Sequence, residues 1–320
     1  MEAARAEQIK DVNVRYHDVA AREYDFKWNI SFGDEGRATV RRKLAKALGR
    51  PPERFERALE VGAGTGYFSL NLLAGGMIEA AVATDISQGM LDALEQRADA
   101  LGLTVETARC EAATLPFPDG SFDLVHGHAI LHHLPDLDAA FAEFRRVLRP
   151  GGMIVFCGEP SRHGDRIAAL PKRAALTAAP LWRCALGAGE RRNGHDEEAG
   201  GHGLELFVDV HSFTPAELAG QSRRAGFESV RVTGEELTAS WFGWVNRTLE
   251  ASAEPDGIPA AWRWWAYGGY LFLRALDRTL LESRLPPAIF YNLLLSARAP
   301  ERLSARAPEW PPAEAPAAAR

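Results

Sequence analysis

Apolar residues recur at two different spacings between residues 54 and 158, and each change of spacing predicts a change of secondary structure. Short apolar runs predict five strands, at residues 57–61, 80–84, 104–108, 122–126 and 153–157. Apolar residues at helical spacing predict the helices that separate most of them, at residues 66–74, 87–101 and 137–148. Ser87 is expected to cap the second helix, and a Pro-Gly-Gly turn at 150–152 is expected before the fifth strand. This alternation predicts an α/β fold, a parallel sheet with helices on both faces.

The alternation stops after residue 158. Residues 160–185 have alanine, leucine and arginine at helical spacing. Residues 187–203 contain six glycines together with charged side chains, which predicts a mobile loop. The last residues, 299–320, contain five prolines and many alanines and are expected to be disordered.

Regular elements return at residue 213. Thr214 as N-cap and Pro215 in the first turn predict a helix that ends at Gly226. Strands are expected at 227–232 and 289–296, which brings the predicted number of strands to seven.

A second interruption, residues 236–285, is rich in aromatic side chains. Along residues 262–278 the apolar positions 264/265, 268, 271/272 and 275/276 fall on one face of a helix. Arg274, Asp277 and Arg278 fall on another face. The simplest interpretation is that the apolar face packs onto the core. The functional interpretations are a hydrophobic cap for a lipid-like or polycyclic molecule, or a surface that touches a membrane.

The composition limits the classes of protein and partner. With 320 residues, of which 46% are hydrophobic, the chain can bury a full core in one large domain or in one domain with insertions. The net charge of −6 disfavours nucleic acid as a partner. Three cysteines without a C-x-x-C spacing predict a reducing compartment. Neither a signal segment nor an 18-residue apolar run is visible, so a cytoplasmic protein without a transmembrane segment is expected.

Residues 58–66, Ala-Leu-Glu-Val-Gly-Ala-Gly-Thr-Gly, predict a strand, a tight glycine turn and the start of a helix. The segment resembles motif I, E-x-G-x-G-x-G, of the class I S-adenosylmethionine-dependent methyltransferases. The resemblance implies that S-adenosylmethionine is the cofactor and that its methionine end is bound by Glu60, Gly62, Ala63, Gly64 and Gly66. In that family the acid at the Glu60 position contacts the ammonium group, often through water.

A dinucleotide-binding turn is the alternative at this site. The fingerprint G-x-G-x-x-G would need glycine or alanine at position 67, where this chain has Tyr67. Asp85 closes the second predicted strand, 19 residues after Gly66, where an acid can accept both ribose hydroxyls of either cofactor. The other interpretation of Asp85 is an acid that interacts with the dipole of the following helix. Ile86 would offer an apolar face to the adenine.

A second match to the family covers residues 110–125, with its Leu-Pro-Phe and Ser-Phe-Asp-Leu-Val runs. It implies that Glu111, where the family more often has aspartate, accepts the adenine amino group. Ala112 would offer its backbone N–H to the ring. Asp123 is expected to hold the adjoining turn.

Four histidines, His126, His128, His132 and His133, follow in the fourth strand and just after it. A metal site is one interpretation, but no H-E-x-x-H or cysteine pair accompanies them. The segment instead resembles the family's segment after the fourth strand, which implies that His126 and Gly127 line the methionine end of the cofactor. A neutral histidine can take a proton from the acceptor, and His128 is the first candidate for this base, His132 the second. The alternative is that these histidines only shape the pocket.

The resemblance also implies an organisation for the whole chain. The class I core is a Rossmann-like, doubly wound sheet of seven strands, with the seventh antiparallel between the fifth and sixth. Its expected segments are residues 51–158, 213–235 and 287–298. Substrate-cap insertions are expected at 159–212 and 236–286.

Residues 1–50 are expected to form an N-terminal helical lid over the cofactor. The spacing of Tyr16, Ala20 and Tyr24 resembles the covering helix of the family, although an ordinary amphipathic helix fits it equally. The expected function is methyl transfer by in-line displacement to a small, moderately apolar acceptor. The alternatives are a non-catalytic adenosylmethionine-binding module and an NAD-dependent oxidoreductase.

Overall fold

The computed structural model describes residues 9, 12–14, 17, 30–191 and 211–301. The expected tyrosine-containing helix at 16–25 lies outside these residues, except for His17, and so does the tail from residue 302. The strands are β1 (Phe55–Val61), β2 (Ile78–Asp85), β3 (Glu106–Arg109), β4 (Phe122–His128), β5 (Leu148–Pro160), β6 (Glu228–Glu235) and β7 (Asn292–Arg298). The α-helices are α3 (Asp34–Leu48), α4 (Tyr67–Ala74), α5 (Gln88–Leu101), α6 (Leu137–Val147), α7 (Arg162–Leu186), α9 (Pro215–Arg224), α10 (Thr238–Ala251) and α11 (Ala260–Leu276). Shorter helical turns are η1 (Leu131–His133), η2 (Pro255–Gly257), η3 (Asp277–Leu281) and η4 (Pro287–Ile289).

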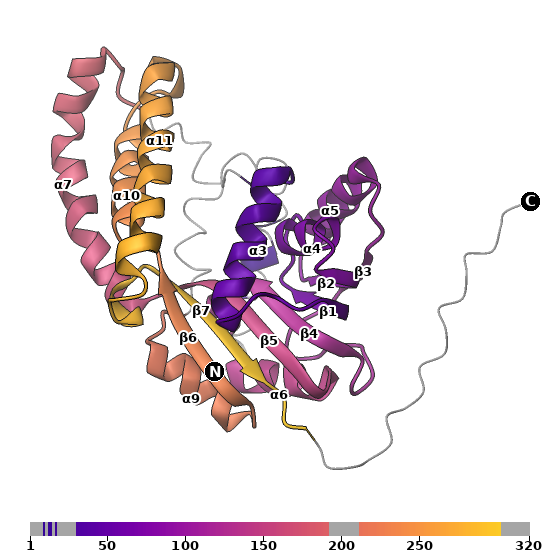
Figure 1. Cartoon of the computed structure of the whole chain (residues 1–320). Coiled ribbons are helices and arrows are strands. Elements are labelled where there is room, and N and C mark those ends of the chain that lie inside the picture. Colours follow the sequence, from indigo (N-terminus) through magenta and orange to yellow (C-terminus); the bar gives the residue numbers. More distant parts are fainter. Residues whose placement is uncertain (1–8, 10–11, 15–16, 18–29, 192–210, 302–320) are drawn as a thin grey trace, which may run out of the picture.

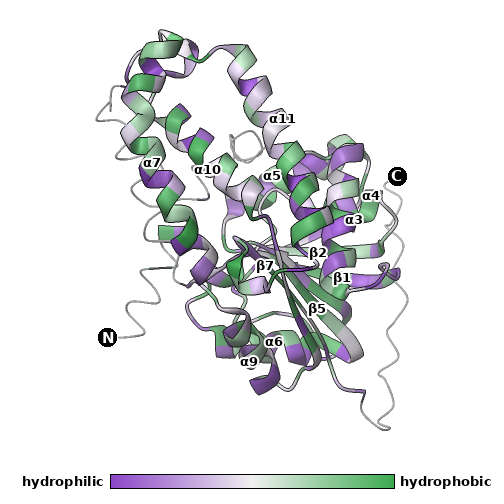
Figure 2. Cartoon of the chain, turned by 60° about the vertical axis from the view of Figure 1, so that its left-hand side comes forward, coloured by the Kyte–Doolittle hydropathy of each residue, from purple (hydrophilic) through white to green (hydrophobic). Residues whose placement is uncertain are grey.

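The seven strands form one sheet in the order β3-β2-β1-β4-β5-β7-β6 (Figure 1). The first five pair in parallel, and β7 is antiparallel to both β5 and β6. Helices α3 and α4 bury apolar side chains against one face of the sheet, and α6 and α9 against the other. Figure 2 shows the hydrophobic residues concentrated along the central strands. The predicted doubly wound sheet with an antiparallel seventh strand is therefore confirmed.

The predicted helix starts follow from side-chain caps. The Ser87 hydroxyl accepts the Met90 N–H at 3.1 Å, so it caps α5 as expected. Thr214 and Glu217 form a reciprocal capping box at the start of α9. Gly226 follows α9 with a φ of 83°, which explains why glycine ends that segment.

Two predicted boundaries are wrong around β5 and β7. The Pro-Gly-Gly segment does not precede β5 but lies inside it as a bulge, since Phe122 pairs with Leu148 whereas Leu124 pairs with Met153. Strand β7 begins at Asn292 rather than at 289, because the preceding Pro287–Ile289 forms a 3₁₀ turn. The strand is followed by a buried Ala299, which exchanges backbone hydrogen bonds with residues 151 and 152. The start of the predicted disordered tail therefore belongs to the sheet. Strand β3 likewise begins at Glu106 rather than at 104.

Helices α7, α10 and α11 pack together and project from the sheet, and we call them the helical tower (Figure 1). Helix α7 follows β5 and α10 follows β6, so the tower occupies the two predicted interruptions. Part of the predicted loop, residues 192–210, lies outside the described residues. Asp277 lies in η3, directly after α11. It is fully buried and accepts the backbone N–H groups of Leu237, Thr238 and Ala239 at the start of α10. No helix in the described ranges combines the length and the apolar character needed to cross a bilayer.

Candidate active site

The glycine turn after β1 has one open position between two packed ones. Gly62, Gly64 and Gly66 all have positive φ, at 62°, 52° and 83°. A Cβ on Gly62 would lie 2.3 Å from Ile130 Cδ1, and one on Gly66 would lie 2.8 Å from Leu94 Cγ. A Cβ on Gly64 would meet nothing within 4 Å. The turn therefore leaves space beside Gly64 for a ligand to approach the backbone closely.

Asp85 holds this turn in place. One of its carboxylate oxygens accepts the Gly64 N–H and the other accepts the Ser87 N–H, both at 2.9 Å. A carboxylate offers about four lone-pair positions, so two backbone bonds leave room for hydroxyl donors. The position is compatible with the ribose contact predicted from the sequence and adds a structural task to it.

The residues predicted for the adenine lie along the same edge of the sheet. Asp85 pairs in register with Arg109, the last residue of β3, and Glu111 and Ala112 follow directly after that strand. The carbonyl oxygen of Ile86 accepts the Arg109 Nε–H at 2.9 Å. The carboxyl ends of β1, β2 and β3 thus bring all three predicted segments side by side, which is where α/β folds of this type bind ligands.

Glu60 is buried beneath the turn rather than open to it. Its carboxylate accepts the backbone N–H of Ser69 at 2.9 Å, and this bond ties β1 to the first turn of α4. Burial raises the pKa of the Glu60 carboxyl to about 8, against the opposing effect of its hydrogen bonds with Ser69. Its contact with the ammonium end of a cofactor stays a prediction.

His126 and Gly127 lie next to the glycine turn but differ in what they expose. The His126 ring is completely buried near Phe68, and within the described part of the chain neither ring nitrogen has a hydrogen-bond partner. Burial lowers the pKa of His126 to about 3, so the ring is neutral. Only the backbone of His126 could therefore line a ligand. Gly127 has no room for a Cβ, which would lie 2.6 Å from Ile130 Cγ2.

His128 is poorly suited to the role predicted for it. Its ring stacks on Phe68 at 5.0 Å and meets Tyr67 edge-on at 5.7 Å. Burial, and secondarily the charge of Lys43, lower the pKa of His128 to about 3. A base for which protonation is this unfavourable has little driving force to take a proton near pH 7. Burial therefore argues against His128 as the base, and that role stays a prediction.

Comparison with known proteins agrees with this geometry. A family model described as a methyltransferase domain matches residues 59–156. The malonyl-[acyl-carrier protein] O-methyltransferase of Methylococcus capsulatus is 32% identical over 229 residues, which cover 67% of this chain and 75% of that protein. This chain belongs to the class I S-adenosylmethionine-dependent methyltransferases.

Further relatives agree with the assignment. The ubiquinone/menaquinone biosynthesis C-methyltransferase of Burkholderia cenocepacia is 33% identical over 150 residues, which cover 47% of this chain and 60% of that protein. The solved structure of Haemonchus contortus phosphoethanolamine N-methyltransferase 2 with S-adenosyl-L-methionine has the same fold, with a TM-score of 0.54 and 16% identity. The match covers 88% of this chain and 57% of that one. The cofactor of this methyltransferase is S-adenosylmethionine, and the dinucleotide alternative is set aside.

The open position at Gly64 fits this cofactor. The Gly64 turn would hold the methionine end, and Asp85 and Glu111 would accept hydroxyl and amino donors farther along the edge. When bound, S-adenosylmethionine supplies an electrophilic methyl group on a sulfonium.

A buried acid that the sequence did not single out lies beside the methyltransferase's glycine turn. Glu159, near the end of β5, accepts the backbone N–H groups of Ile130, Leu131 and His132 at 3.0 to 3.2 Å. It is also 2.9 Å from Nδ1 of the His132 ring. A carboxylate can only accept a hydrogen bond, so Nδ1 is the donor in this contact. The same turn carries Ile130, whose side chain fills the space next to Gly62.

A second buried charged group lies behind His128. The Lys43 ammonium pairs with the Glu235 carboxylate, and Lys46 donates to the carbonyl oxygen of Gly234 at 2.7 Å. Burial alone would lower the pKa of Lys43, but the Glu235 charge outweighs it and raises that pKa. Tyr270 of α11 donates to Glu236 at 2.8 Å. The sequence analysis did not identify these acids, because Glu235 lies beyond the predicted end of its strand and its partner Lys43 is 192 residues away.

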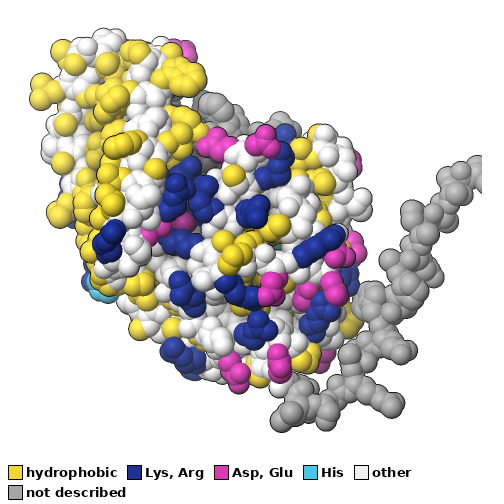
Figure 3. All heavy atoms as spheres, viewed as in Figure 1, with side chains coloured by type: hydrophobic (Ala, Val, Ile, Leu, Met, Phe, Trp, Pro, Cys, Tyr) yellow, Lys and Arg dark blue, Asp and Glu magenta, His cyan; other side chains and the backbone are white. Residues whose placement is uncertain are grey.

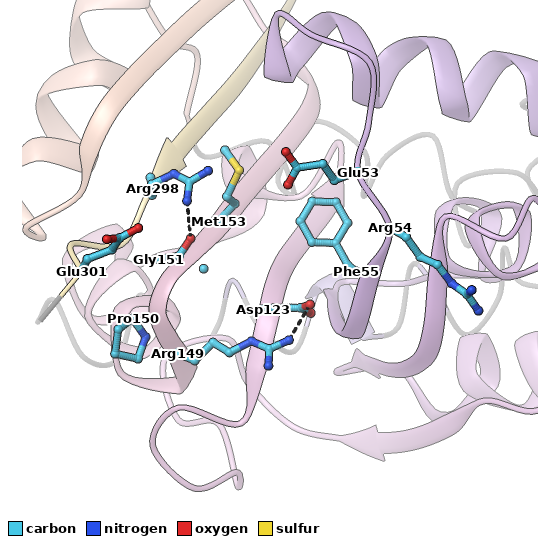
Figure 4. Close-up of a pocket in the computed structure, with 11 residues that line it drawn as sticks. Glu53, Arg54, Phe55, Asp123, Arg149, Pro150, Gly151, Met153, Arg298 and Glu301 are labelled. Atoms are coloured by element: carbon cyan, nitrogen blue, oxygen red, sulfur yellow. Dashed lines mark hydrogen bonds and ion pairs between the residues drawn. The ribbon is translucent and has the colours of Figure 1, made fainter. Parts of the chain in front are cut away.

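A metal site and a second binding hollow are two other possibilities. No set of three His, Cys, Asp or Glu residues in the described ranges is arranged to hold a metal ion. The hollow in Figure 4 lies at the opposite end of the strands, beside Phe55 and Asp123. Its guanidinium groups are already paired, Arg149 with Asp123 and Arg298 with the carbonyl oxygen of Gly151. The hollow is therefore separate from the cofactor turn.

Proposed function

We propose that this enzyme transfers the methyl group of S-adenosylmethionine by in-line displacement to a small, moderately apolar acceptor, with His132 as the general base. The observation that carries the proposal is the bonding of His132 to Glu159 on the turn that packs against Gly62. This turn and the open position at Gly64 belong to the same edge of the sheet, so a base and a methyl donor would be close to one another.

The name of one relative supports a reaction that needs a base. That relative is named for C-methylation in ubiquinone/menaquinone biosynthesis, and methylation of a C–H carbon leaves a proton to be removed. The other is named for O-methylation of malonyl-[acyl-carrier protein], whose free carboxylate can accept a methyl group without losing a proton. The apolar character is supported by the tower, whose aromatic helices α10 and α11 follow strand β6 from the same edge of the sheet.

His132 and Glu159 would divide the work between them. His132 would take the acceptor's proton at Nε2, and Glu159 would hold the ring orientation through Nδ1 and stabilise the imidazolium that forms. The backbone bonds from Ile130 and Leu131 would keep the Glu159 carboxylate fixed throughout. His128, with its pKa near 3, would serve as part of the pocket wall.

Label transfer tests the reaction. Cofactor with a tritiated methyl group is incubated with the enzyme and a cell extract, and the label is expected in small molecules that partition into an organic solvent. Label confined to protein or to polar products would contradict the proposed acceptor. No transferred label at all would favour the non-catalytic binding module.

Single turnovers with the acceptor found in this way test the base. His132→Ala is expected to slow methyl transfer by about a hundredfold to ten-thousandfold, as the loss of a general base does. Glu159→Gln is expected to alter the pH dependence of the rate. His133→Ala is the matched control, because Glu159 bonds to the ring of the neighbouring His132 and this substitution leaves that bond in place. Each variant must still bind S-adenosylhomocysteine, which shows that the turn is intact. An unchanged rate for His132→Ala at every pH would contradict the proposed role of His132 as the base.

The cytoplasmic location expected from the sequence stays a prediction.

A further inference from the structure

Helix α11 touches the rest of the protein along two of its faces. Toward the sheet, Tyr267 donates to Glu35 of α3 and Tyr270 to Glu236 after β6. Toward the tower, the Trp262 ring lies 5.1 Å from Trp182 of α7. Gly269 faces the Phe242 ring of α10, which a Cβ would approach to 2.7 Å. These contacts leave a third face of the helix.

The third face is entirely apolar and lies at the surface. Its exposed residues are spaced three, one or four apart, as on one side of a helix. They are Ala261, Trp264, Trp265, Gly268, Phe272 and Ala275, and we call them the α11 stripe. Trp264 is 76% exposed, Phe272 66% and Trp265 54%. The simplest interpretation of the sequence, that this face packs onto the core, is wrong.

Large exposed apolar side chains are concentrated on the tower. Eight stand out in the described part of the chain, and seven of them belong to α7, α11 or η3. Besides those of the stripe they are Leu170, Leu176 and Leu181 of α7 and Leu280 of η3. Figure 3 shows apolar side chains along the visible side of the tower, whereas the sheet domain shows mixed charges. Exposed apolar side chains concentrated in one part of a protein in this way are typical of an interaction site.

The charge of the tower is opposite to that of the chain. Together α7, α10, α11 and η3 contain nine Lys or Arg and three Asp or Glu, a net charge of +6, in a chain whose net charge is −6. One of the three acids, Asp277, is buried. Exposed Arg263 and Arg278 stand at the two ends of the stripe. Figure 3 shows Lys and Arg side chains gathered at the foot of the tower.

We propose that the α11 stripe docks on the surface of a lipid bilayer that contains anionic lipids. Tryptophan and phenylalanine on one helix face, flanked by arginines, suit the boundary between head groups and acyl chains. Each arginine near an anionic surface adds about a fivefold gain in binding. A second copy of the chain is a poorer occupant, because two towers that each carry +6 would repel one another.

Co-sedimentation with vesicles tests this proposal. The full chain is expected to bind vesicles of phosphatidylcholine mixed with phosphatidylglycerol, and to bind phosphatidylcholine alone at least about fivefold more weakly. The double variant Trp264→Gln/Phe272→Gln is expected to bind the mixed vesicles at least about tenfold more weakly than wild type, since it loses the apolar area that enters the bilayer. Both side chains are exposed, so the fold is retained, and a circular dichroism spectrum checks this.

Matched substitutions elsewhere separate the stripe from general effects. Leu101→Gln removes the exposed apolar residue that lies outside the tower, on α5, and is expected to leave vesicle binding unchanged. Arg278→Glu is expected to weaken binding about fivefold or more, whereas Arg54→Glu, at the start of the sheet domain, is not.

Three results would overturn the proposal. One is wild-type protein that stays in the supernatant with both kinds of vesicle. Another is an equal loss of binding in the Leu101→Gln control. The third is a wild-type dimer that the double variant converts to a monomer, with no vesicle binding, since a second copy would then cover the stripe. The measurement uses neither cofactor nor acceptor, so its failure and the failure of the proposed reaction are distinguishable.

Discussion

Helices α6 and α11 carry the same kind of apolar pattern and put it to opposite uses. On α6, Phe141 and Phe144 are fully buried between the helix and the sheet. On α11, Trp264 and Phe272 are among the most exposed large apolar side chains of the described residues. Helical spacing therefore identifies an apolar face but not its partner. The partner of α6 is a sheet face within the same domain, whereas the partner proposed for the α11 stripe is a bilayer.

Replacing one phenylalanine by alanine in each helix measures the difference in stability between the buried and the exposed apolar face. Phe141→Ala is expected to lower the free energy of unfolding by about 3 to 5 kcal/mol, because it opens a cavity in the core. Phe272→Ala is expected to change it by less than about 0.5 kcal/mol, because its side chain is already in water. Chemical denaturation of both variants gives the two values. A cost above about 2 kcal/mol for Phe272→Ala would mean that the stripe is packed in solution.

Gly64 in the cofactor turn and Gly76, which follows α4, can be compared by the same substitution. Both have positive φ, 52° and 65°, and a Cβ on either would meet nothing within 4 Å. Alanine at each position is expected to cost about 1 to 2 kcal/mol of stability from backbone strain alone. Only Gly64→Ala is expected to weaken S-adenosylmethionine binding, by about tenfold to a hundredfold, because its methyl group enters the ligand's space. Calorimetric titration gives the S-adenosylmethionine affinity of each variant. Equal affinities would contradict the placement of the cofactor beside Gly64.

Glu60 should leave a signature in the pH dependence of stability. Its pKa is raised from 4.5 to about 8 in the folded protein, so the folded state keeps a proton that the unfolded state releases. Stability therefore falls as the pH rises from 4.5 toward 8. Glu60→Gln removes this contribution. The stability of the variant relative to wild type is expected to increase by about 2 kcal/mol from about pH 6 to about pH 8. Denaturant titrations at the two pH values measure it, and a constant difference would show that Glu60 is ionised throughout.

Local chemistry made the core predictable. Glycines that need positive φ, a serine cap and an acid at a strand end each act over a few residues, so the order of strands and helices from 55 to 128 could be derived from the sequence. The candidate site was predictable to the same extent. The predicted turn, Asp85 and the segment at Glu111 come together at one edge because parallel strands place their carboxyl ends there.

Partnerships between distant residues were not predictable. Glu159 is 27 residues from His132, Lys43 is 192 from Glu235, and Asp277 is 40 from the start of α10. Nothing in the spacing of these residues identifies the donor that each acid meets. The preference for His128 over His132 as the base could not draw on such information, since the burial of each ring and its hydrogen-bond partners depend on the fold.

The bonds of Glu159 have a consequence for how acceptor preference can change. The proposed base is anchored by β5 and the η1 turn, and among the described residues Glu159 makes no hydrogen bond to α7, α10 or α11. The proposed proton-transfer pair is therefore held by the sheet domain, which α11 contacts elsewhere, through Tyr267 and Tyr270. A tower grafted from a relative onto this sheet would bring a new acceptor or a new surface preference while the proton-transfer pair kept its geometry.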